Sequence, residues 1–223
     1  MKSIILALGI ILCQQVSAQN LTGVFLGAQA NTANYNVNYS KQKTNYTYGF
    51  QAGVMMKVPF DKGIFFAPSV FYSLKGYKVK FAQYTFPPDP MASDNEVRLH
   101  TFELAALLQV DFGNKPSHGF LKVGPTLDFQ LFGHEKFNLQ TGGSVSRKMT
   151  FGYGDYGHYS ANALAQLGFE TSSGLVFSVN YTYGLTSISN ADGGPKILHR
   201  CIGISFGKYL NAKKIVLDTR NKE

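Results

Sequence analysis

The chain has 223 residues, enough for one domain with its own core or for one closed barrel. It carries 21 Lys and Arg against 13 Asp and Glu, a formal net charge of +8, and only two cysteines. So few cysteines exclude a thiolate metal cluster, and no run of the sequence approaches the roughly 18 apolar residues of a spanning helix, which excludes a helical membrane protein.

The first 18 residues predict a secretory signal peptide. Lys2 is followed by an apolar run over residues 4–13 and by the small-residue cleavage site Val16-Ser17-Ala18. Acylation at Cys13 is disfavoured because the bulky Leu12 precedes it. We therefore predict a signal peptide over 1–18, a barrel domain over 19–210 and a basic periplasmic tail over 211–223. Without Lys2, 20 basic side chains face 13 acidic ones, a charge of +7, which in an exported chain favours anionic lipid over nucleic acid.

From Leu21 onwards apolar and polar residues alternate with a period of two, the pattern of strands with one apolar face. The clearest segment is 175–185, where Leu175, Phe177, Val179, Tyr181 and Tyr183 alternate with small or polar residues. In chain order, eight strands are predicted, over residues 22–35, 46–58, 64–81, 96–112, 120–132, 158–170, 175–185 and 196–210.

The predicted connections alternate in length. Short turns at 59–63, 113–119 and 171–174 take turns with long polar loops at 36–45, 83–95, 140–157 and 189–195. This pattern is typical of an outer-membrane barrel whose short turns face the periplasm. We predict an all-β fold, an eight-stranded antiparallel up-and-down transmembrane β-barrel in the cell outer membrane, with both termini periplasmic. A soluble β-sandwich or lipocalin-like barrel is the alternative, but the polar face is Gly, Ser, Thr, Asn and Gln rather than Lys and Glu.

Two sets of side chains gain a role from this prediction. Aromatic residues near the strand ends are expected to form girdles: Tyr46, Tyr48, Tyr72, Phe112, Tyr181, Tyr183 and Tyr209. Charged residues of both signs occupy strand positions whose side chains should face the barrel interior: Lys57, Lys75, Glu103, Asp111, Lys122, Asp128 and Glu170. Because eight strands enclose only enough room for side chains, we predict that these residues form a sealing polar network in the barrel interior rather than an ion path.

A catalytic alternative rests on His158 and Ser160. At i and i+2 they would project from one face of a strand, and a hydroxyl beside a base is what acyl transfer needs, with Glu170 or Asp155 as the acidic partner. Their parity points inward, away from the lipid face where an acyl chain would arrive, so no catalytic residue is predicted. The remaining histidines, His100, His118, His134 and His199, show no metal-ligand spacing, and no glycine-rich phosphate loop is present; we predict neither metal nor cofactor.

Several short motifs, in their order and spacing, resemble one family. They are the signal ending in Ser-Ala-Gln, Gly49-Phe50-Gln51-Ala52-Gly53, residues 68–76, Val123-Gly124-Pro125 and residues 181–188. Over about residues 21–210 the chain resembles the PorT-like outer-membrane β-barrel family of Bacteroidetes. The resemblance implies an eight-stranded outer-membrane barrel but no single activity. The family's named member belongs to a protein-secretion apparatus, and that role is not carried over.

The functional prediction is a non-enzymatic outer-membrane barrel with a sealed lumen. Its extracellular loops would act in surface contact, ligand binding or envelope complex assembly, and its partners would be outer-membrane lipid and envelope proteins, with the barrel itself monomeric. Two alternatives stay open: a lipid-A-modifying acyl hydrolase, and a barrel subunit of a secretion or uptake machine.

Overall fold

The computed structural model describes residues 20–113 and 115–211, and all helix or strand structure in these ranges is β-strand. The predicted signal peptide and almost all of the predicted basic tail lie outside the described residues. Within them, no helix is long and apolar enough to cross a membrane. The strands are β1 (Leu21–Val37), β2 (Ser40–Lys41), β3 (Lys43–Asn45), β4 (Thr47–Asp61), β5 (Ile64–Lys80), β6 (Asp94–Phe112), β7 (His118–Asn138), β8 (Ser144–Lys148), β9 (Tyr159–Glu170), β10 (Leu175–Gly184) and β11 (Lys196–Tyr209).

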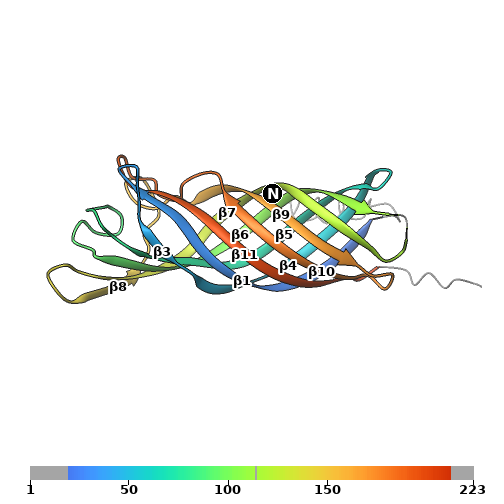
Figure 1. Ribbon diagram of the computed structural model, residues 1–223, viewed down its shortest axis with the longest axis horizontal. Coiled ribbons are helices and arrows are strands. Elements are labelled where there is room, and N and C mark those ends of the chain that lie inside the picture. Colours follow the sequence, from blue (N-terminus) through green and yellow to red (C-terminus); the bar gives the residue numbers. More distant parts are fainter. Residues whose placement is uncertain (1–19, 114, 212–223) are drawn as a thin grey trace, which may run out of the picture.

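These strands form one antiparallel sheet that closes on itself. Neighbours follow the chain, and β11 returns to pair with β1 from Gly23↔Tyr209 to Asn36↔Lys196. The short β2 and β3 lead into β4 and pair with β1 and β5, while β8 folds back on β7. The wall is therefore the predicted eight-stranded barrel, with its strands strongly tilted to the long axis (Figure 1). A closed sheet leaves no unpaired edge.

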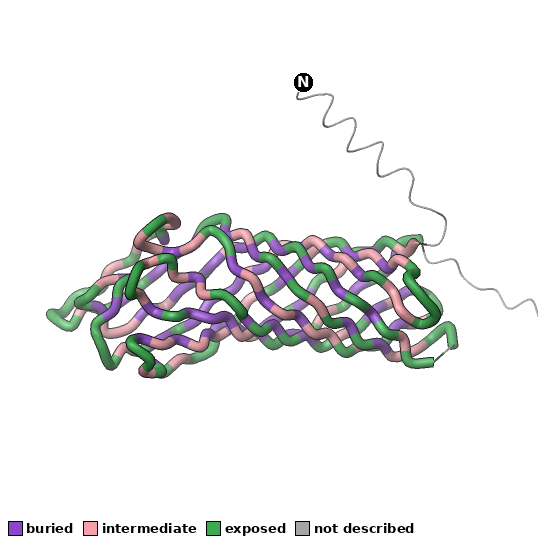
Figure 2. Tube along the Cα trace, turned by 90° about the horizontal axis from the view of Figure 1, so that it is seen from above, coloured by how far each residue is buried: buried purple, intermediate pink, exposed green. Residues whose placement is uncertain are grey.

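Along the long strands, buried residues alternate for the most part with exposed or half-buried ones (Figure 2). The outward side of the middle of the barrel is a continuous ring of exposed apolar side chains, here called the apolar band. It includes Val24, Leu26, Phe50, Val54, Phe66, Phe102, Leu104, Leu108, Val110, Leu121, Val123, Leu127, Leu167, Phe169, Phe177, Val179, Ile202, Ile204 and Phe206. The inward side holds glycines and polar or charged residues together with a smaller number of apolar ones, whereas a water-soluble barrel has an apolar inside and a polar outside.

The two ends of the barrel differ. The turn end carries the β4–β5, β6–β7 and β9–β10 connections, and the first and last described residues meet there, where Asn211 Nδ2 donates to Asn20 O at 2.7 Å. Gly63 and Gly174 have φ of 71° and 80° in two of these turns, a region that suits glycine. The loop end carries the long connections between β1 and β4, β5 and β6, β7 and β9, and β10 and β11 (Figure 1).

The structure corrects three expectations. The predicted strand at 120–132 continues to Asn138 and pairs with β8, inside a segment predicted to be loop. A register shift beside Thr101 leaves both Leu131 and Phe132 exposed, so a bulge interrupts the period of two in β7. Tyr209, expected in an aromatic girdle, is 1% exposed and faces the lumen, because its parity on β11 is that of Gly207 and Ser205.

Candidate functional site

The lumen at the turn end holds one ammonium between two carboxylates. Lys57 Nζ on β4 lies 2.7 Å from Asp111 Oδ2 on β6 and 2.9 Å from Glu170 Oε2 on β9. Gln109 Nε2 donates to both acids, at 2.6 Å to Asp111 and 3.2 Å to Glu170. His118 Nε2, from the start of β7, lies 2.9 Å from Asp111 Oδ2. Four strands thus converge on a polar cluster that fills this end of the barrel.

The spacing of Asp111, His118 and Glu170 is also compatible with a metal ion. His118 is not predicted as part of a site, since the three residues lie on three strands and no local spacing in the sequence relates them. Lys57 Nζ already sits among these atoms, 3.4 Å from His118 Nε2, and supplies the positive charge that a cation would bring. The geometry therefore favours an ion-pair cluster over a metal centre.

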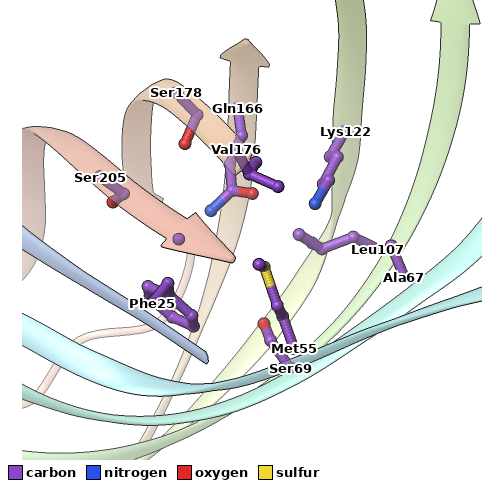
Figure 3. A pocket seen from close by; sticks show the side chains of 11 residues that line it. Phe25, Met55, Ala67, Ser69, Leu107, Lys122, Gln166, Val176, Ser178 and Ser205 are labelled. Carbon is purple, nitrogen blue, oxygen red and sulfur yellow. The ribbon is translucent and has the colours of Figure 1, made fainter. Parts of the chain in front are cut away.

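A water-sized cavity of about 20 Å³ lies next towards the loop end. Lys122 and Gln166 point towards it, with Ser178, Ser205 and Met55 around it (Figure 3). Lys122 Nζ stands 4.7 Å from the Phe120 ring centroid, and none of the described carboxylates is within ion-pair distance of it. Of the charged residues predicted to line the lumen, Lys122 is thus the one that the structure leaves outside the ion pairs of the described chain.

An apolar layer lies between this cavity and the middle of the barrel. Phe71, Leu107 and Leu164 pack together with Ala67 and Ala105, and Phe25 joins them with its ring centroid 5.5 Å from that of Phe71. Gly53, opposite Phe71 on β4, has no room for a side chain, because a Cβ there would come within 2.3 Å of Phe71 Cβ. Bulky side chains therefore fill the cross-section at this level.

A second ion cluster lies beyond this layer. Lys75 Nζ on β5 is 2.8 Å from Glu103 Oε1 and 2.7 Å from Asp128 Oδ2, with all three side chains no more than 2% exposed. Thr101 donates to the same Glu103 oxygen at 3.2 Å. The interior charges that form ion pairs therefore lie in two separate clusters, one around Lys57 and one around Lys75.

Between the apolar band and the loop end, the polarity of the two faces of the barrel wall is reversed. The outward residues of β5, β6 and β7 become charged, with Lys78 2.9 Å from Glu96 on the outside. The inward residues become apolar and aromatic and form the largest buried hydrophobic cluster among the described residues, here called the loop-end core: Ala33, Tyr35, Val37, Tyr77, Val79, Val97, Leu99, Met149, Tyr156, Ile188 and Ile197. This part of the barrel is built like a water-soluble one, so it projects beyond the apolar band.

One buried carboxylate is built into the loop-end core. Glu135 accepts hydrogen bonds from Tyr156 Oη at 2.8 Å, Asn95 Nδ2 at 3.2 Å and Arg147 Nε at 2.8 Å. Burial raises the pKa of the Tyr35, Tyr77 and Tyr156 phenols above the ordinary tyrosine value, so these groups are neutral at physiological pH.

The same residues fasten the loops over the mouth of the lumen. Arg147 Nη2 donates to Pro88 O at 2.7 Å and Tyr35 Oη to Pro87 O at 3.2 Å, which holds the β5–β6 connection. Gly157 N donates to Ile188 O at 2.7 Å and joins the β7–β9 and β10–β11 connections. The loop end is a packed cap rather than an open vestibule.

The residues of the catalytic alternative are not brought together. Ser160 is buried near the loop end of β9 and accepts a hydrogen bond from Gln130 Nε2 at 2.8 Å. His158 precedes β9 and is exposed, so it does not share the inward face expected for it. Glu170 lies at the opposite end of β9, bound to Lys57, and Asp155 accepts from Thr150 in the loop. At roughly 3.3 Å per strand residue, Ser160 and Glu170 cannot act on one substrate atom.

Comparison with known proteins gives one family and several distant structures. The family model described as outer membrane protein beta-barrel domain matches residues 17–190. Ail of Yersinia pestis is 15% identical over 84% of this chain and 98% of its own, with a TM-score of 0.41. OprG from Pseudomonas aeruginosa is 12% identical over 85% and 96% (TM-score 0.43), and Neisserial surface protein A is 11% identical over 83% and 96% (TM-score 0.41). No curated protein sequence matches significantly.

Proposed function

Because the chain belongs to the outer membrane protein β-barrel domain family, we propose that it is a sealed, non-enzymatic barrel that contacts other molecules through its loop end. The proposal includes membership of the PorT-like branch of Bacteroidetes barrels, a monomeric state, and a turn end that faces the periplasm with both termini. Short turns on one side and long loops on the other support this orientation.

The exposed aromatic side chains of the loop end carry the proposal. Tyr39, Tyr84 and Tyr153 are exposed in three different connections, and Phe86 and Met91 are exposed in the same connection as Tyr84. They stand beyond the apolar band, on the charged part of the barrel, so membrane lipid does not cover them. Exposed aromatic residues on a scaffold that is already rigid are suited to binding, because little conformational entropy is lost on contact.

The filled lumen favours a function in surface contact over one in the transport of solutes through the barrel. Two ion clusters, an apolar layer and the loop-end core lie in series between the turn end and the loop end. A solute would have to displace each of them. Function is then left to the outer surface of the molecule.

Orientation is tested by labelling intact cells with a membrane-impermeant maleimide. Tyr153→Cys places a thiol in a long loop, and Ser172→Cys places a matched thiol in the turn between β9 and β10. Cys201 is buried and contributes little background. We expect Tyr153→Cys to be labelled and Ser172→Cys only after the cells are permeabilised, with the folded band of each variant verified on cold SDS gels. The reverse pattern would contradict the orientation.

Surface contact is tested with a triple variant, Tyr39→Ser/Tyr84→Ser/Tyr153→Ser. Its matched control is Phe60→Ser/Lys62→Ser/Lys115→Ser, three exposed residues of the turn end. We expect cells that display the loop-end variant to lose most of their adhesion to neighbouring cells and matrix, while the turn-end variant retains it. Equal adhesion of the two variants would argue against the loop end as the contact surface.

A further inference from the structure

A groove of about 440 Å³ runs along the outside of the barrel where β10, β11, β1 and the segment from β2 to Tyr46 lie side by side. Its lining includes the polar or charged Thr32, Asn34, Lys41 and Arg200. Ile202 and its partner Tyr181 on β10 follow one step further along the strands towards the apolar band. We call it the girdle groove. It lies at a change of surface type, because Ile202, Ile204 and Phe206 continue the apolar band on one side and the exposed Lys196 follows on the other. This is the depth at which lipid headgroups meet a membrane protein.

Arg200 is held in place within this groove. Its Nη1 donates to His199 O at 2.8 Å and to Gly184 O at 3.1 Å, and its Cζ lies 3.5 Å from the Tyr183 ring centroid. Stacking and two carbonyl contacts orient the guanidinium and occupy Nη1. Its other nitrogens remain able to donate to a ligand.

The positive charge of the girdle groove is not balanced locally. Over residues 20–113 and 115–211, no carboxylate lies within ion-pair distance of Arg200 or Lys41. No acidic residue lines the groove, whereas Asn34 and Thr32 add an amide and a hydroxyl.

A second groove above the apolar band provides a contrast. It is lined by Lys78, Lys80 and Lys136, but Asp94 and Glu96 stand among them, and Lys78 Nζ is 2.9 Å from Glu96 Oε2. Its lysines are therefore partly neutralised. Of these two grooves, only the girdle groove has no acidic residue in its lining, so an anion would bind it in preference.

We propose that the girdle groove binds the phosphate of an anionic membrane lipid, with Arg200 and Lys41 as the charged contacts and Tyr181 and Ile202 against the first part of its acyl chain. A lipid is favoured over a soluble anion because the polar part of the groove continues directly into the apolar band. This inference rests on the proposed function in one respect: the proposed membrane orientation decides which leaflet supplies the lipid. Binding itself is measured on reconstituted protein and does not depend on the loop-end contact function.

The test uses the barrel in nanodiscs of phosphatidylcholine alone or with one fifth phosphatidylglycerol or lipid A, and native mass spectrometry to count retained anionic lipid. A basic side chain near an anionic surface contributes about fivefold in affinity, so Lys41→Gln/Arg200→Gln should bind about 30-fold more weakly. The control Lys78→Gln/Lys136→Gln removes the same charge from the second groove and should bind as the unmodified protein does. Arg200→Lys, which keeps the charge but not the planar fork, should be intermediate.

Substitution of Arg200 removes its stacking on Tyr183 and could disturb folding. Lys41 is exposed, so the single variant Lys41→Gln tests the site without that effect. This single variant should bind anionic lipid about fivefold more weakly. Equal weakening in both double variants would show a diffuse charge effect and would overturn the site. Displacement of the lipid by inorganic phosphate at the same concentration would assign a soluble anion and would overturn lipid as the ligand.

Discussion

At the scale of single residues, the removal of a buried cation from between two acids is one of the costly changes in this barrel. Lys75→Met leaves Glu103 and Asp128 buried without their cation, and we expect the free energy of unfolding to fall by about 3–5 kcal/mol. Urea titration in detergent micelles, followed by the folded band on cold SDS gels, measures this loss. Glu103→Gln is the control, because Asp128 still pairs with Lys75 and the loss should be much smaller. Equal losses would mean that Lys75 does not hold the cluster.

The sequence was enough to predict that these charged side chains face the lumen, but not which of them pair with one another. Alternation along each strand was enough to predict that Lys57, Lys75 and Glu103 face the lumen. Lys57, however, contacts Asp111 and Glu170 over 54 and 113 residues of sequence, and such contacts depend on barrel closure and strand stagger. His118 was placed in a turn, where no alternation assigns it a face. It joins the cluster because β7 begins at that residue.

At the scale of elements, the loop-end core shows where periodicity alone falls short. Beyond Phe132 the outward residues of β7 become His134 and Lys136 and the inward residues become Glu135 and Phe137. The bulge at Leu131 shifts the parity at the same place, so a continuing strand resembles a polar loop in sequence. The eight long strands and most of their bounds were predictable, since each keeps one apolar face across the band. The β7–β8 hairpin was not.

The buried phenols of the loop-end core predict a loss of stability at alkaline pH. Burial raises the pKa of Tyr35, Tyr77 and Tyr156, so above the unfolded value of about 10 the unfolded state releases protons that the folded state keeps. Their contribution is complete below that pH and falls by up to about 1.4 kcal/mol per pH unit for each phenol above it. Urea midpoints at neutral and alkaline pH measure this change. Tyr35→Phe should reduce the alkaline loss, and Tyr39→Phe, in an exposed turn, should leave it as it is; the same reduction in both variants would contradict the prediction.

At the scale of the whole molecule, the layers of the lumen act in series, so opening one of them does not open a path. Phe71→Ala/Leu107→Ala removes two of the large side chains of the apolar layer and enlarges the cavity beside Lys122, but both ion clusters and the loop-end core remain. We expect neither this variant nor the unmodified protein to show single-channel steps in planar bilayers. The variant should nevertheless be several kcal/mol less stable, because large-to-small changes of buried side chains typically cost about 2–5 kcal/mol each. Leu104→Ala, an exposed neighbour on the lipid side of β6, is the control for stability. Reproducible channel steps from the unmodified barrel would contradict the sealed lumen, and steps from the double variant alone would make the apolar layer the single barrier to ions.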